Sequence, residues 1–417
     1  MYIQRDMNKS LFRAQRRTPY LFILVMLALI LGVIFFANTQ RDAIQLQALS
    51  ILGFAPTPTP FASDLATRGA NLFQNGDVAG ALVLFEEALK QRPNDINYLY
   101  EYGQLLIENE RPADEILPIA ERAIAIAPND PRGYVLKGRA LMWEDPSGAI
   151  QAAIQGIDID PTFAPLYSVQ GVAFTNLGRW QEGLRNAERA YELDPQDIFV
   201  LTSYQWPLTY VGRYQEAIDY LEDAIAINPN LISPYFYLAA LYRLPNVNRA
   251  DMAIGTYNRV LELQPTSAKA YLRLCQTYAN VDQARFDVAQ PYCDAAIRLD
   301  PNYGEAYMQR GQMQYARRNY EGSIESFEKC VENGSTRIEC WYIRGFAHYR
   351  LSECDEAWGV LEEARPMAVN QNLPSIVEQI DNVMDAITQR CAGYSGRTVP
   401  TPVPPTPLPP TPIGGFG

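Results

Sequence analysis

Prolines recur at nearly constant intervals through the middle of the chain. Seven of them each follow a helix-like stretch, and successive members are 35, 33, 34, 34, 36 and 36 residues apart. They are Pro93, Pro128, Pro161, Pro195, Pro229, Pro265 and Pro301. A fixed period near 34 residues predicts a stacked repeat array, rather than the two or three globular domains that a length of 417 residues would otherwise suggest.

Each period contains two segments in which apolar residues recur at helical spacing. A turn rich in Gly, Asn and Asp separates the two segments, as in residues 74–77 and 177–179. We therefore predict a repeating unit of two antiparallel helices. One such hairpin cannot bury its own apolar face, so we expect the chain to be stable only as a stack of units.

Residues at fixed positions of these hairpins resemble the tetratricopeptide repeat (TPR) family. The first unit shows the family spacing in Gly69, Leu72, Ala81, Phe85, Ala88 and Pro93. Nine units in register span residues 63–367, and a helix without the repeat pattern lies in 368–392. The resemblance implies an all-α fold, a right-handed superhelical solenoid of about nine TPR-like helical hairpins plus a capping helix.

The N-terminal part of the chain combines positive charge with an apolar run. Residues 1–41 carry six cations and one carboxylate, whereas the whole chain has a net charge of −12, which leaves −17 on the remainder. Residues 20–37 are all apolar. As a helix they would span about 27 Å, enough for the hydrocarbon core of a bilayer.

We therefore predict an N-terminal transmembrane helix in a single-pass membrane protein. The positive-inside rule assigns a cytoplasmic segment to 1–19, a transmembrane signal anchor to 20–38, and an extracytoplasmic position to the solenoid. A cleaved signal peptide is the alternative, but the bulky Phe35 and Phe36 precede the end of the run, where cleavage needs small residues.

Proline-rich segments flank the predicted solenoid. Residues 39–62 are interpreted as a juxtamembrane segment and a Pro/Thr linker, and 393–417 as a Pro-rich disordered tail. The tail contains a PxxP sequence at 402–405, so it is either a spacer or a ligand for a partner domain.

The first helices of a repeat solenoid usually line its ligand-binding concave face. The residues that this family would direct inward are Tyr100, Arg132, Arg139, Trp143, Trp206, Tyr210, Phe236, Arg243, Lys269, Tyr315, Tyr342, Phe346, Tyr349 and Arg350. Aromatic and arginine side chains are common anchors of protein interfaces, and cations collected on one face of an acidic chain suggest a ligand groove. Two alternatives remain: some of the aromatics pack the core, or the predicted face is shifted by one residue.

We predict a non-catalytic scaffold that binds a protein or an extended peptide. Carbohydrate or cell-wall binding through the aromatic residues is the alternative. The carboxylate-binding clamp known in some TPR proteins is absent, because Ala66, Ala70 and Glu101 occupy its positions. The acidic charge disfavours nucleic-acid binding.

The sequence gives little indication of a catalytic site or a metal site. His348 is the single histidine, which excludes a multi-histidine metal site. No Gly-rich phosphate loop or nucleophile elbow occurs. We predict no catalytic residue, no cofactor and no metal, and we expect His348 to be a core residue.

The six cysteines all lie in the last 143 residues, and no pair has CxxC spacing. In an oxidising compartment an even number of cysteines predicts disulfides. In the repeat geometry that the resemblance implies, the adjacent sites pair Cys275 with Cys293, Cys330 with Cys340 and Cys354 with Cys391. Six buried thiols are the alternative.

Overall fold

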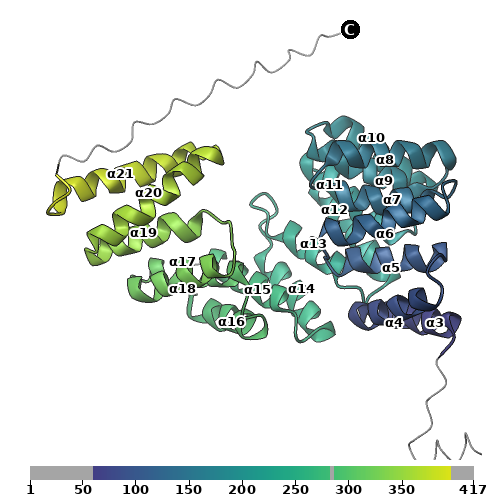
Figure 1. Ribbon diagram of the computed structural model, residues 1–417, viewed down its shortest axis with the longest axis horizontal. Coiled ribbons are helices and arrows are strands. Elements are labelled where there is room, and N and C mark those ends of the chain that lie inside the picture. Colours follow the sequence, from purple (N-terminus) through teal and green to yellow (C-terminus); the bar gives the residue numbers. More distant parts are fainter. Residues whose placement is uncertain (1–59, 282–285, 396–417) are drawn as a thin grey trace, which may run out of the picture. The chain divides into compact units, whose positions relative to one another are not determined.

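The computed structural model describes residues 60–281 and 286–395, and all regular secondary structure in these residues is helical. Figure 1 shows the nineteen helices. They are α3 (Ala62–Gln74), α4 (Val78–Gln91), α5 (Ile96–Glu108), α6 (Ala113–Ile126), α7 (Pro131–Leu141), α8 (Pro146–Ile159), α9 (Ala164–Asn176), α10 (Trp180–Leu193), α11 (Ile198–Tyr210), α12 (Tyr214–Ile227), α13 (Ser233–Tyr242), α14 (Ala250–Leu263), α15 (Ala268–Val281), α16 (Phe286–Leu299), α17 (Gly304–Ala316), α18 (Tyr320–Glu332), α19 (Glu339–Leu351), α20 (Cys354–Asn370) and α21 (Pro374–Arg390). The prediction of an all-α fold is confirmed for this part of the chain.

Successive helices pair into nine hairpins, from α3–α4 to α19–α20, and α21 follows as a single helix packed on α20. The second helix of each hairpin contacts the first helix of the next. The first helices α5, α7, α9, α11 and α13 also contact one another in series and form a continuous layer.

The predicted signal anchor (20–38) lies outside the described residues. The same is true of the cytoplasmic segment (1–19) and of most of the linker (39–62) and the tail (393–417). Among the helices that the structure describes, none has both the length and the apolar character needed to cross a membrane.

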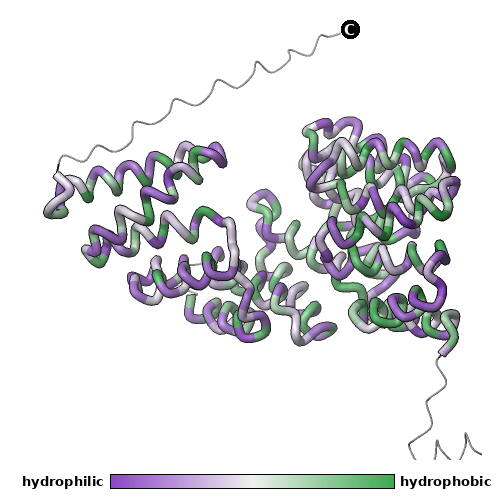
Figure 2. The backbone as a smooth tube through the Cα atoms, in the orientation of Figure 1, coloured by the Kyte–Doolittle hydropathy of each residue, from purple (hydrophilic) through white to green (hydrophobic). Residues whose placement is uncertain are grey.

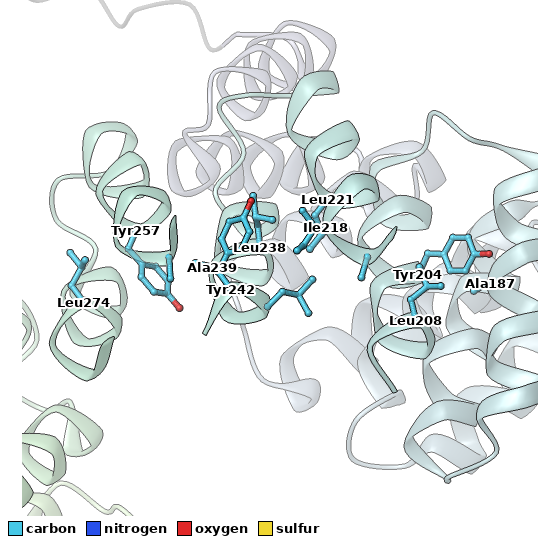
Figure 3. Close-up of a cluster of buried hydrophobic side chains, with 13 residues drawn as sticks. Ala187, Tyr204, Leu208, Ile218, Leu221, Leu238, Ala239, Tyr242, Tyr257 and Leu274 are labelled. Atoms are coloured by element: carbon cyan, nitrogen blue, oxygen red, sulfur yellow. The ribbon is translucent and has the colours of Figure 1, made fainter. Parts of the chain in front are cut away.

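The hydrophobic core runs from hairpin to hairpin. Figure 3 shows one cluster that includes Ala187 of α10, Leu221 of α12, Tyr257 of α14 and Leu274 of α15, all buried. Figure 2 shows the corresponding alternation of apolar and polar residues along the helices. Because one cluster draws on four consecutive hairpins, each hairpin depends on its neighbours for burial of its apolar face.

Glycines permit the two helices of a hairpin to approach closely. A Cβ atom added at Gly69 would lie 2.9 Å from the ring of Phe85, and one at Gly345 would lie 2.6 Å from Cδ2 of Leu361. The aromatic or aliphatic side chain of the second helix therefore occupies the space that a larger residue on the first helix would need.

Many hairpin turns contain a residue with left-handed backbone conformation. Gly178 and Gly212 have φ angles of 75° and 81°, and the corresponding position of the second hairpin is Glu110, with φ 55°. The N–H group of Arg179 donates to the carbonyl of Phe174 over 2.9 Å, as in a Schellman motif. This conformation ends the first helix and reverses the chain, and in the second hairpin it holds Glu110 at the site described below.

Three disulfides stabilise the C-terminal hairpins, and no free cysteine occurs in the described residues. The bridges are Cys275–Cys293, Cys330–Cys340 and Cys354–Cys391, with Cα–Cα distances of 5.3, 6.2 and 6.2 Å. They are the pairs expected from the repeat geometry. The first joins α15 to α16, the second joins α18 to α19, and the third fastens the end of α21 to the start of α20. Each contributes on the order of 2–4 kcal/mol to stability.

The ninth hairpin offers a matched test of the close helix crossing. Gly345→Ala places a methyl group against Leu361, and we expect it to lower the free energy of unfolding by about 1–3 kcal/mol. Gly359→Ala is the control, because Gly359 lies on α20 and a Cβ atom added there would point into open space. There we expect stabilisation of up to about 1 kcal/mol, from helix propensity alone. Urea denaturation and hydrogen exchange of α19 and α20 measure both effects, and equal behaviour of the two variants would contradict the crossing argument.

Candidate binding site

A cavity of about 310 Å³ lies against the first helices of the second to sixth hairpins. Residues of α5, α7, α9, α11 and α13, of the turns after α5 and α7, and of the first part of α6 line it. Its aromatic residues are Trp143, Phe199, Trp206 and Tyr237, and its charged residues are Glu108, Glu110, Arg111, Arg139 and Glu144. This cavity, called the aromatic cavity below, therefore combines aromatic surface with both signs of charge.

The aromatic rings of the cavity pack edge to face across three hairpins. Trp143 lies in the turn after α7, and its ring centroid is 4.6 Å from that of Trp206 on α11, at an interplanar angle of 71°. The rings of Trp206 and Tyr237, on α13, are 6.1 Å apart at 74°. Burial raises the pKa of Tyr237 to about 12, and the neighbouring Glu108 adds to this rise. At the opposite end, Trp143 remains 47% exposed and offers its surface to solvent.

Arg139 is a buried part of the cavity wall, with 7% of its surface exposed. Its guanidinium donates to Oε1 of Gln104, lies 3.3 Å from Oε1 of Glu108 and stands 4.1 Å from the ring centroid of Phe199. Its Nε atom has no hydrogen-bond partner in the described residues. Arg139 therefore links α5, α7 and α11, and its charge is balanced within the protein.

Glu108 also connects hairpins that are far apart in sequence. Ser233, at the start of α13, donates its hydroxyl to Oε2 of Glu108 over 2.8 Å, across 125 residues. In the next turn, Glu110 forms an ion pair with Lys269. Asn230 donates its side-chain amide to the carbonyl of Gln74 over 3.2 Å. The turns of the first two hairpins thus contact the segments that begin the sixth and seventh.

A second cavity of about 540 Å³ lies between these contacts. Glu108, Glu110 and Ser233 line both cavities, so the two are neighbours. Phe236 and Lys269 belong to the second cavity, where the Lys269 Nζ atom stands 4.5 Å from the centroid of the Phe236 ring.

Three of the predicted groove residues meet at the first cavity and two at the second, whereas four others lie elsewhere. The guanidinium carbon of Arg132 lies 5.7 Å from the centroid of the Tyr100 ring. The same guanidinium forms an ion pair with Asp130 at 2.7 Å. Tyr210 is exposed at the end of α11. Arg243 lines a separate cavity of about 370 Å³.

The five C-terminal residues of the predicted groove make contacts within the last two hairpins and with α21. The guanidinium of Arg350 hydrogen-bonds to the hydroxyl of Tyr315, which raises the pKa of Arg350. Tyr342, Phe346 and Tyr349 are partly buried against the hydrophobic cluster that joins α20 and α21. For these three aromatics the structure supports a packing role.

Three of the cations predicted to face a ligand are paired within the protein. Arg132, Arg139 and Lys269 each form an ion pair with a carboxylate of this chain, so their charges are balanced without a ligand. The predicted face is also shifted by one residue in the sixth hairpin, where Tyr237 and not Phe236 lines the aromatic cavity. Sequence reasoning missed Phe199 as well, although an aromatic residue in the first turn of a first helix could have indicated it.

The predicted core residue His348 is 9% exposed, and its Nδ1 atom lies 2.7 Å from Oε2 of Glu353. In the described residues, no group of three or more His, Cys, Asp or Glu side chains is arranged to hold a metal ion.

Models of one known family and one known protein match parts of this chain. One tetratricopeptide repeat model matches residues 67–131 and 276–337, and another matches 209–231. The small glutamine-rich tetratricopeptide repeat-containing protein 2 of Mycosarcoma maydis is 25% identical over 119 residues, which is 28% of this chain. The match covers only 31% of that relative's length.

Two solved structures match this chain. Human IFIT1, solved as a dimer with m7Gppp-AAAA, has a TM-score of 0.54 and 12% sequence identity, covering 85% of this chain and 95% of that one. At this identity the likeness concerns the fold alone. MamA has a TM-score of 0.33 and 22% identity, covering 39% of this chain and 94% of its own.

Glu108 provides a test of the buried contacts around the cavity. Glu108→Ala leaves Arg139 buried without its carboxylate and removes the acceptor of Ser233, so we expect a loss of about 3–5 kcal/mol in the free energy of unfolding. Glu115→Ala is the control, because it removes a solvent-exposed ion pair with Arg111 at 2.8 Å. Its expected cost is below about 1 kcal/mol. Chemical denaturation of both variants checks this, and a small effect at Glu108 would contradict its structural role.

Proposed function

We propose that this chain, which carries tetratricopeptide repeats, is a non-catalytic scaffold whose concave face binds an extended segment of another protein. The exposed Trp143, packed edge to face on Trp206, is the observation that carries this proposal. Tryptophan is enriched among the residues that dominate binding energy at protein interfaces. An exposed tryptophan held rigid by a second ring can offer apolar surface at a small entropic cost.

The arrangement of the two cavities supports an extended ligand. The first has about 310 Å³ of space, enough for one or two side chains, and the second has about 540 Å³. Because Glu108, Glu110 and Ser233 line both cavities, the two lie side by side, as sites for neighbouring side chains of one extended peptide would. A scaffold of this kind raises the local concentration of its partner and needs no catalytic residue.

We further propose that an N-terminal signal anchor holds the scaffold in the cell membrane, with the solenoid outside the cytoplasm. The apolar run 20–37 and the cations before it support the anchor and its orientation. The pairing of all six cysteines supports the compartment, because disulfides persist where the environment is oxidising.

The topology predicts the reactivity of the cysteines in intact cells. After mild reduction, a membrane-impermeant maleimide should label Cys391, which lies at the end of α21, and without reduction it should label no cysteine. Lysed cells treated in the same way are the control for total thiol. Labelling that appears only after lysis would contradict an extracytoplasmic solenoid.

The binding proposal predicts a specific effect of the exposed tryptophan. Peptides selected from a random dodecapeptide library on the full-length protein should lose about tenfold or more in affinity for Trp143→Ala. Trp180→Ala is the matched control, because Trp180 begins α10 and is also partly exposed, at 37%, but lies outside both cavities. Fluorescence anisotropy measures the affinities. Equal losses in the two variants, or none, would contradict a ligand site at Trp143.

A further inference from the structure

We propose that the aromatic cavity receives the positively charged side chain of a lysine or arginine in the bound segment. Trp143 and Trp206 would contact the cation, and Glu144 would supply the opposite charge. This inference rests on the proposed function and names the chemistry that the same site recognises.

Internal ion pairs satisfy most of the charges around the cavity. The pairs are Arg139–Glu108, Arg111–Glu115 and Lys269–Glu110. Glu144 is the exception among the charged lining residues, since it has no ion pair or side-chain hydrogen bond in the described part of the chain. It directly follows Trp143 in the turn between α7 and α8 and is exposed. The site therefore presents one uncompensated negative charge beside an exposed tryptophan.

The aromatic rings are suited to a cation. A lysine or arginine within about 6 Å of a ring centroid is attracted by the negative face of the ring, and tryptophan is the best acceptor of this kind. The walls of both cavities already use the same interaction. The Arg139 guanidinium stands 4.1 Å from the centroid of Phe199, and the Lys269 Nζ atom stands 4.5 Å from that of Phe236.

The overall charge favours the same ligand. The chain beyond residue 41 has a net charge of −17, so its field attracts basic segments and repels acidic ones. A ligand carboxylate would have to approach Glu144, and the two cations of the wall, Arg139 and Arg111, are already paired with Glu108 and Glu115. Both the local and the long-range electrostatics thus select against an acidic peptide.

The test begins with the same library of random dodecapeptides, applied to the immobilised full-length protein. We expect the selected pool to be enriched in lysine and arginine several-fold over the input for the wild-type protein. The enrichment should fall for Glu144→Gln to the smaller part that the aromatic rings and the overall charge supply. Asp64→Asn is the matched control, because Asp64 is an exposed carboxylate of α3 outside both cavities, and it should leave the enrichment unchanged.

A selected peptide then gives the magnitude. Replacing its essential lysine or arginine by norleucine removes the charge and keeps an apolar chain, and we expect the Kd to rise about five- to thirtyfold on the wild-type protein. On Glu144→Gln the same replacement should raise the Kd by a factor about two- to fivefold smaller than on the wild-type protein, because the carboxylate is lost while the ring contacts remain. Glu144 is exposed, so the variant should keep the wild-type helix content and melting temperature, which circular dichroism checks.

The outcomes separate this inference from the proposed function. Selected peptides that depend on Trp143 but show no preference for basic residues, or prefer acidic ones, would overturn the cationic ligand and leave peptide binding intact. If the wild-type protein retains no more library peptide than Trp143→Ala does, the proposed function is overturned, and the inference with it.

Discussion

The close crossing of the two helices in each hairpin is the constraint on which the rest of the structure depends. Gly311 and Gly345 leave room for a large side chain of the partner helix, so the two backbones approach and the hairpin forms. The hairpin still exposes an apolar face, which only the next hairpin covers. The cluster that runs from α10 to α15 is the result (Figure 3). The same stacking aligns the first helices and brings residues of the second to sixth hairpins to one cavity.

The sequence predicted those features that local spacing controls. The proline period and the small residues at crossings set the hairpins, and the three disulfides follow from sites that are adjacent within or between neighbouring units. The contact between Glu108 and Ser233 could not be predicted in this way, because it depends on small rotations that add up over four hairpins. Spacing along the sequence also assigns the face of a helix only to within about one residue. It therefore indicates Phe236 as an inward-facing residue, where Tyr237 lines the aromatic cavity.

The distribution of charge illustrates a general difficulty in finding binding sites from composition. Arg139 and Lys269 looked like ligand-binding cations, because the chain is acidic and both lie on first helices. In the structure each one is paired with a carboxylate of the second hairpin, at the end of α5 or in the turn that follows. A buried charge needs such a partner, so burial explains the pairing of Arg139, whereas Lys269 is only partly buried. The residue left without a partner, Glu144, has the opposite sign.

The contacts between the second hairpin and the sixth and seventh have a consequence for how this chain folds. A linear repeat array passes stability only between neighbours, so folding can begin in any unit and spread from there. Here the hydrogen bond between Glu108 and Ser233 and the ion pair between Glu110 and Lys269 join hairpins that are far apart in sequence. They span 125 and 159 residues. Such contacts raise the average sequence separation of interacting residues, which slows folding, and they couple the opening of distant units. The N-terminal hairpins are thereby expected to unfold as one cooperative block, whereas the C-terminal hairpins, held by short-range covalent bridges, can respond unit by unit.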